Sequence, residues 1–159
     1  MKKILILMVL VATVLSCGTP KTVIESKKVI KGNWTLDEIT YSEAGTFTVK
    51  LLNDTSKKCF EGSTWRFISN NNEGIYTINN GDCPTGERNF IFTIQEVNKE
   101  SGLFDFLLKP TDAKHNSEDG TGFRLKLARL SDSSMRWEQT VSLEGKPFTI
   151  SMNFSKISE

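Results

Sequence analysis

Large apolar and polar side chains alternate along many short segments of the chain beyond residue 31. Residues 123–127 and 148–154 show the alternation most clearly, and turn-forming Asn, Gly, Asp and Ser residues separate the segments. Because successive side chains of a β-strand point to opposite faces, this period of two predicts strands with one buried and one solvated face. Such strands are typical of antiparallel sheets, since parallel sheets bury both of their faces.

Nine segments are strand candidates, eight by this alternation and one, residues 75–78, by its short run of β-prone residues. They are residues 34–39, 46–51, 65–67, 75–78, 89–95, 104–108, 123–128, 135–139 and 148–155. Eight or nine antiparallel strands form either an up-and-down barrel or a two-sheet sandwich, and the alternation alone does not choose between them. A turn or two of helix is expected over residues 54–60, with Asp54 as its N-cap. Arg124 and Lys126 lie on the polar face, which argues against a transmembrane barrel.

The first seventeen residues form a segment of a different kind. Lys2 and Lys3 precede a mostly apolar run over residues 4–15, which is too short to span a bilayer as a helix. This arrangement is typical of a secretory signal. The sequence Val14-Leu15-Ser16-Cys17 resembles the bacterial lipobox, whose cysteine becomes the lipidated first residue of the mature chain. We therefore expect a signal peptide over residues 1–16 and acylation of Cys17, for example with palmitate.

This resemblance also implies a location. Gly18, rather than an aspartate, follows the cysteine, so the simple sorting rule favours the outer membrane of a Gram-negative bacterium. We expect a lipid-anchored protein of the cell envelope with two further parts. Residues 17–31 are polar and lysine-rich and are expected to form a flexible tether. Residues 32–159 are long enough to form one β-domain with its own core.

Charge and cysteine content restrict the partners and the compartment. The chain holds 20 Lys and Arg against 19 Asp and Glu, and this near-neutral balance argues against a nucleic-acid partner. Once Cys17 is acylated, Cys59 and Cys83 remain, and an even remainder in an oxidising compartment indicates a disulfide. A redox or metal-binding pair is the alternative, but the wide spacing of the two cysteines does not favour it.

The order of several motifs is similar to that of a known family. Gly32-Asn33-Trp34 opens the first predicted strand and resembles the lipocalin signature, in which the tryptophan plugs the closed end of an eight-stranded barrel. Residues 59–67, 74–78, Cys83 and 86–88, followed by the last two predicted strands, resemble bacterial lipocalin-like lipoproteins over about residues 32–157. The resemblance implies an all-β, antiparallel up-and-down barrel. It also implies an arginine stacked over Trp34, for which Arg136 is the candidate by position.

Large aromatic residues are the candidates for ligand contact. Those expected to face the barrel interior and bind a ligand are Trp65, Phe67, Phe92, Phe106, Phe123 and Trp137. A small barrel either fills itself with such side chains or encloses one ligand-sized cavity. The first hypothesis is therefore a protein that binds a small hydrophobic ligand in its barrel. The alternative is a non-catalytic scaffold or inhibitor whose loops, over residues 79–88 or 112–120, contact an envelope protein.

Catalytic and metal-binding patterns do not stand out. His115 is the single histidine and lies in a polar loop without a partner motif. Asp37-Glu38 and Glu118-Asp119 are adjacent pairs, and neighbouring side chains on a strand point to opposite faces. We therefore expect a monomeric, non-enzymatic protein without cofactor, metal or nucleic acid, attached to the membrane through its lipid.

Overall fold

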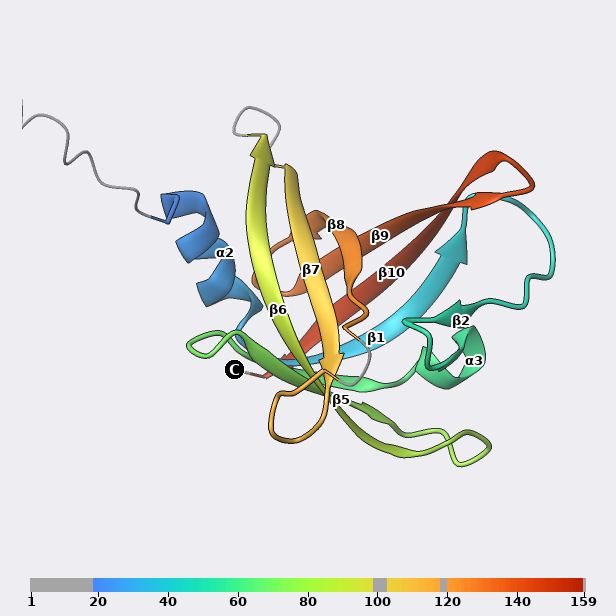
Figure 1. Ribbon diagram of the computed structural model, residues 1–159, viewed down its shortest axis with the longest axis horizontal. Coiled ribbons are helices and arrows are strands. Elements are labelled where there is room, and N and C mark those ends of the chain that lie inside the picture. The colour runs from blue at the N-terminus through green and yellow to red at the C-terminus, as the bar shows by residue number, and fades with distance from the viewer. Residues whose placement is uncertain (1–18, 99–102, 118–119, 159) are drawn as a thin grey trace, which may run out of the picture.

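The computed structural model describes residues 19–98, 103–117 and 120–158 of the chain (Figure 1). The elements are α2 (Lys21–Ile30), β1 (Gly32–Tyr41), β2 (Lys50–Leu51), β3 (Thr55–Ser56), α3 (Lys57–Phe60), β4 (Thr64–Ile68), β5 (Glu73–Ile78), β6 (Gly86–Asn98), β7 (Leu103–Thr111), β8 (Phe123–Leu130), β9 (Ser134–Leu143) and β10 (Lys146–Ser158). The signal peptide expected over residues 1–16 and the acylated Cys17 lie outside the described residues. Within these residues, no helix combines the length and the apolar character needed to cross a membrane.

Eight strands form a closed antiparallel barrel in the order β1-β10-β9-β8-β7-β6-β5-β4. Strand β1 closes it by pairing on one side with β10 and on the other with β4. At the closure, Trp34 stands opposite Lys156 in β10 and opposite Trp65 in β4. The predicted up-and-down barrel is confirmed, and closure removes the free edges that a sandwich would leave.

One of the nine predicted strands lies outside the barrel. Within residues 46–51, only Lys50–Leu51 is a strand, and it pairs with β3 in a separate two-stranded sheet. The predicted helix over residues 54–60 shrinks to α3, whose N-cap position is taken by Ser56 instead of Asp54. Asp54 lies in the turn between β2 and β3, where its side chain accepts hydrogen bonds from Tyr76 and Arg88 instead of capping a helix.

Aromatic rings fill the barrel. The largest side chains with less than 2% exposure include Trp34, Trp65, Trp137, Tyr76, Phe60 and Phe106, and the rings of the last five belong to one network of ring contacts. Trp65 stacks on Tyr76 with 4.5 Å between ring centroids, and Phe106 stacks on Trp137 at 4.6 Å. Gly74 makes room for one more ring, because a Cβ there would lie 2.1 Å from Phe90 Cζ. The inward half of the alternating pattern is therefore a packed core.

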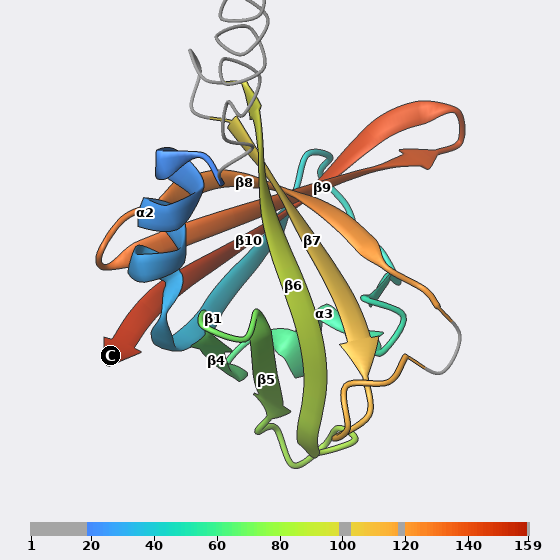
Figure 2. The ribbon, with the colours of Figure 1, turned by 60° about the vertical axis from the view of Figure 1, so that its left-hand side comes forward.

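Helix α2 corrects the expectation of a flexible tether over residues 17–31. Its ten residues pack beside β6 and β8 at one end of the barrel, with Val23 and Ile30 buried (Figure 2). Hydrogen bonds to its backbone fix it further, since Trp34 Nε1 donates to the Ile30 carbonyl at 2.8 Å and Ser69 Oγ to that of Lys27 at 2.6 Å. The sequence does not predict this helix, because its residues are mostly polar and show no continuous apolar stripe. Two buried side chains seven residues apart are enough to anchor it on the barrel.

The opposite end of the barrel is covered by the connection between β1 and β4. This cap, residues 42–63, contains β2, β3 and α3 and inserts Leu51, Leu52 and Phe60 into the core. The Phe60 ring lies 5.5 Å from that of Tyr76. The two ends of the barrel are therefore closed by different pieces of chain, α2 at one end and the cap at the other.

Candidate functional site

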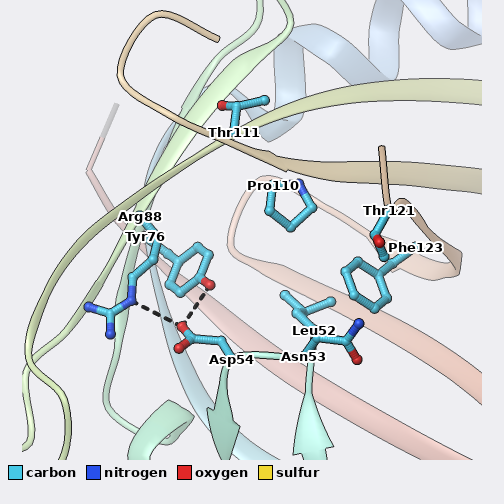
Figure 3. A pocket seen from close by; sticks show the side chains of 9 residues that line it. All are labelled: Leu52, Asn53, Asp54, Tyr76, Arg88, Pro110, Thr111, Thr121 and Phe123. Carbon is cyan, nitrogen blue, oxygen red and sulfur yellow. Dashed lines mark hydrogen bonds and ion pairs between the residues drawn. The ribbon is translucent and has the colours of Figure 1, made fainter. Parts of the chain in front are cut away.

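A pocket of about 380 Å³ opens where the cap meets the barrel mouth (Figure 3). Its lining comes from the cap, from strands β5, β6, β7 and β8, and from the connection between β7 and β8. The lining residues are Leu52, Asn53, Asp54, Tyr76, Arg88, Pro110, Thr111, Thr121 and Phe123. The Asp54–Arg88 pair and Tyr76 lie on one side of this pocket, and Leu52 and Phe123 lie on the other side together with Asn53 and Thr121 (Figure 3).

Three side chains form the polar wall. Asp54 Oδ2 accepts a hydrogen bond from the Tyr76 hydroxyl at 2.8 Å and another from Arg88 Nε at 3.0 Å (Figure 3). Arg88 also donates from Nη1 to the Gly86 carbonyl and from Nη2 to the Pro84 carbonyl. The guanidinium is thus held by one carboxylate and two backbone carbonyls, which pre-organises a charged pair at the rim.

Tyr76 stays protonated in this setting. Burial raises the pKa of its phenol, and the negative charge of Asp54 and the hydrogen bond to that carboxylate raise it further. Arg88 opposes these effects but does not outweigh them. Because the phenol keeps its proton, it donates to Asp54 across the physiological pH range.

A tight turn contributes to both walls of the pocket, with Leu52 in the apolar wall and Asp54 in the polar wall. Leu52 and Asn53 have φ values of 50° and 56°, and the Asp54 amide donates to the Leu51 carbonyl at 2.9 Å. Left-handed backbone at a leucine costs about 1–2 kcal/mol, which the surrounding packing must offset. Leu52 is 4% exposed, so its side chain is held in the core while the next two residues reach the rim.

The apolar wall lies across the pocket from the charged pair. Leu52 and Pro110 form part of it, and Phe123 is its half-buried aromatic member (Figure 3). Thr111 Oγ1 is buried beside this wall, and no described group bonds to it. A buried hydroxyl without a partner is a group that a ligand or an ordered water would satisfy.

The structure separates the six aromatic residues that the sequence assigned to ligand contact. Trp65, Phe67, Phe106 and Trp137 are at most 2% exposed and pack on other rings of the core. None of these four side chains lines the mouth pocket, so they serve packing. Only Phe123 lies at the mouth pocket.

Phe92 has an intermediate place. It stacks on Phe106 in the core with 5.2 Å between ring centroids. It also borders a second hollow of about 330 Å³ on the wall formed by β6, β7 and β8, together with Leu107 and Phe123. With 2% of its surface exposed, Phe92 contributes mainly to the core.

The motif residues lie at the end of the barrel opposite the mouth. Trp34 is fully buried there, next to Ile30 of α2, and Gly32 has a φ of 112° that favours glycine. The cation over the tryptophan ring is Lys156, with Nζ 5.5 Å from the ring centroid. Arg136, the candidate by position, instead pairs with Glu138 at 2.8 Å. Lys156 makes this contact instead of the candidate Arg136, because the register of β1 and β10 places Lys156 opposite Trp34.

The predicted disulfide is confirmed. Cys59 in α3 is bonded to Cys83 in the connection between β5 and β6, with 5.7 Å between their Cα atoms. It ties the cap to the strand pair that carries Tyr76 and Arg88. Among the described residues, no group of three His, Cys, Asp or Glu side chains is placed to hold a metal ion.

The main polar residues of the pocket were not singled out as ligand contacts from the sequence. The sequence predicts Asp54 as a helix cap and Tyr76 as part of a strand, and Arg88 belongs to the residues 86–88 that resemble the lipocalin-like lipoproteins. The Asp54–Arg88 bond joins residues 34 positions apart, so it depends on how the cap folds back over β5 and β6. The sequence holds one signal for such a pair: an acidic residue precedes the loop that the disulfide closes, and a basic residue follows it.

Comparison with known proteins adds one structural likeness. The chain is similar to a solved structure described as a lipocalin-like protein from Bacteroides uniformis ATCC 8492. The two share 14% sequence identity with a TM-score of 0.49, and the match covers 81% of this chain and 99% of that one. No protein-family model matches the sequence, and no curated protein matches it. The architecture described above therefore stands on the strand order and register.

Proposed function

We propose that this protein binds a small amphiphilic molecule in the pocket at the mouth of its barrel. The observation that carries the proposal is the fixed Asp54–Arg88 pair facing the apolar wall of Leu52, Pro110 and Phe123 in one pocket of about 380 Å³. Ligand sites of proteins are concave and combine apolar walls with a few oriented polar groups, in volumes of roughly 300–1,000 Å³. The pocket lies near the lower end of that range, which favours a compact ligand.

The lining defines the kind of ligand. An apolar portion would lie between Leu52 and Phe123, where burial contributes about 25 cal/mol per Å². A polar portion would face the charged pair, with two of the five Arg88 N–H donors still available beyond the three that are engaged. The hydrophobic ligand expected from sequence is thereby narrowed to one with a polar end. It would bind at the rim, because aromatic rings occupy the barrel interior.

The proposed activity is binding without chemistry. Asp54 already accepts two hydrogen bonds, and the raised pKa of Tyr76 leaves that residue protonated rather than available as a base or nucleophile. His115, on the connection between β7 and β8, lies 3.4 Å from Glu73 and does not line the pocket. These groups stabilise the rim instead of forming a catalytic set.

The proposal includes a location in the cell envelope. The lipobox-like sequence at residues 14–17 supports acylation of Cys17 and attachment to the outer membrane. Because α2 begins at Lys21, only three residues would separate the lipid from the folded domain. We expect Cys17→Ala to shift the protein from the membrane fraction to the soluble fraction of cell envelopes, as followed by immunoblot after fractionation. Retention of that variant on the membrane would contradict the acylation.

Fluorescence titration with 1-anilinonaphthalene-8-sulfonate, a compact amphiphilic anion, tests the pocket. We expect Phe123→Ala to weaken probe binding at least tenfold, because the aromatic side of the apolar wall is lost. Phe104→Ala is the matched control, since Phe104 is half-buried on β7 beside α2 at the other end of the barrel. Equal binding by the wild type and both variants would place the probe elsewhere and count against the pocket.

A scaffold or inhibitor remains the second candidate function, and the filled core favours it. Rings at most 2% exposed make a rigid barrel that could present loops to an envelope protein. The segments in question are residues 79–88, which contain Cys83 of the disulfide and the first residues of β6, and the described part of 112–120. Cross-linking in intact envelopes would support this function if one protein is captured reproducibly and is lost when either loop is replaced by a Gly-Ser linker.

A further inference from the structure

The hairpin formed by β9 and β10 extends beyond the barrel (Figure 2). Pairing between β8 and β9 ends at Lys126 and Glu138, whereas β9 continues to Leu143. Residues 139–143, which we call the β9 arm, therefore pair with β10 alone. Their outer edge has no strand beside it in the register of the described residues.

The two edges of this hairpin are treated differently. On the β10 side, the Ser42 amide donates to the Thr149 carbonyl at 2.9 Å, and the Thr149 amide donates to Ser42 Oγ at 3.0 Å. Pro147 follows on the same edge and has no N–H to offer. The edge of the β9 arm carries neither a proline nor a charge, the two devices that commonly protect an exposed edge.

The turn of the hairpin defines which groups point outward. Glu144 and Gly145 form a two-residue turn with φ values of 52° and 79°, closed by the facing residues Leu143 and Lys146. The closing pair of such a turn is hydrogen-bonded, and the pattern then alternates along the strands. The N–H and C=O groups of Thr140 and Ser142 therefore point away from β10. The bonds between Thr149 and Ser42 fit the same alternation on the opposite edge.

We propose that the β9 arm pairs antiparallel with the β9 arm of a second copy of this chain. A two-fold axis at Val141 would place Thr140 opposite the partner's Ser142 and Ser142 opposite the partner's Thr140. Each of these two pairs exchanges two backbone hydrogen bonds, which gives four in total. Such an isologous contact is self-complementary and closes after two copies.

Side chains support the second copy as the occupant. Val141 and Leu143 are 38% and 41% exposed and share one face of the arm, so pairing would join two apolar patches into one. Val141 would face the partner's Val141 at a non-hydrogen-bonded position, where side chains approach most closely. All five residues of the arm are uncharged, so no like charges oppose each other within it. Glu138 would face the partner's Glu144, which limits the pairing to five residues and makes the dimer weak.

Sedimentation equilibrium of the purified protein, over a concentration series that reaches millimolar, tests the proposal. We expect a reversible monomer–dimer equilibrium that Ser142→Pro weakens at least about tenfold, because two of the four bonds lose their donor. Proline is tolerated at this position in the hairpin, since the Ser142 N–H points outward. Ser142→Ala is the matched control and should associate like the wild type. A protein that stays monomeric, or a proline variant that dimerises equally, would overturn the proposal.

Amide hydrogen exchange on the wild type provides a test that needs no variant. Protection of the Thr140 and Ser142 amides should rise with protein concentration, while that of Val141, which is bonded to β10, should stay constant. A dimer that protects other amides instead uses another surface and also overturns the proposal. This inference is independent of the mouth pocket, because the arm shares no residue with the pocket lining.

Discussion

The two ends of the barrel are closed in different ways. At the α2 end, helix α2 is held by two buried aliphatic side chains and by hydrogen bonds to its own backbone carbonyls. At the mouth, the cap is held by a disulfide, by the Asp54–Arg88 pair and by the Tyr76 hydroxyl. The first end needs only apolar shape and a few donors, whereas the second depends on particular side chains placed around a pocket.

This difference supports the proposal that a ligand binds at the mouth. Buried aliphatic and tryptophan side chains seal the α2 end and leave Trp34 fully inaccessible. The mouth keeps charged groups only partly exposed, with Asp54 and Arg88 side chains 21% and 24% accessible. Partly buried charges are costly unless paired, and Asp54 and Arg88 form such a pair at the rim of the pocket proposed to bind the ligand.

The largest effect is expected at the α2 end. Trp34→Ala should lower the free energy of unfolding by about 3–5 kcal/mol, because it leaves a cavity and removes the donor to the Ile30 carbonyl. Urea unfolding followed by far-UV circular dichroism measures this loss. Binding of the anionic probe by the remaining folded protein should be unchanged, and a loss of both together would break the distinction between the two ends.

Removal of the disulfide tests the mouth. Replacement of Cys59 and Cys83 by serine should lower the free energy of unfolding by about 3 kcal/mol, mainly by restoring freedom to the unfolded chain. Because the bridge ties the cap to the connection between β5 and β6, the variant should also bind the probe more weakly. Urea unfolding and probe titration of the double variant measure the two effects. Unchanged probe binding in the folded variant would show that the cap holds the pocket without its covalent bond.

Alkaline pH should lower the free energy of unfolding through Tyr76 at the mouth, by less than the two preceding changes. The pKa of Tyr76 is raised in the folded protein above its ordinary value of 10.0, so only the unfolded chain loses this proton as the pH passes 10.0. The folded state then binds more protons, and stability falls by up to about 1.4 kcal/mol per pH unit above that value. Tyr76→Phe should remove this contribution in urea titrations across the range.

A matched control sharpens the pH prediction. The pKa of Tyr41 is also raised, chiefly by burial, but this residue lies away from the pocket against Phe47 and Phe148. Tyr41→Phe should therefore leave the Tyr76 contribution in place. A pH dependence that is identical in the wild type and in Tyr76→Phe would show that the phenol is not buried against Asp54.

Much of the barrel could be predicted from sequence because its signal is local. The period of two predicts seven of the eight barrel strands, the β-prone run at residues 75–78 predicts β5, and the even number of remaining cysteines predicts the bridge. Residues 46–51 show the same alternation but contribute only β2 to a small sheet, since no barrel neighbour pairs with them. Helix α2 was missed because polar residues surround its two buried side chains.

The site was harder to predict for a physical reason. Whether aromatic side chains enclose a void depends on their summed volume and mutual stacking, which one sequence does not reveal. Trp65, Phe106 and Trp137 fill the interior, so the pocket lies at the rim and not inside the barrel. Of the six aromatic residues predicted to contact a ligand, only Phe123 lines it. The contacts between Asp54, Tyr76 and Arg88 arise from the folding of the cap over the barrel.

The central claim is that a small molecule binds at the mouth and not in the interior. Native mass spectrometry of the protein purified from an envelope extract tests it most directly, with Phe123→Ala and Phe104→Ala prepared in parallel. We predict a co-purifying molecule of one defined mass on the wild type and on Phe104→Ala, and its loss from Phe123→Ala. The same added mass on all three proteins, or bare protein throughout, would contradict the claim.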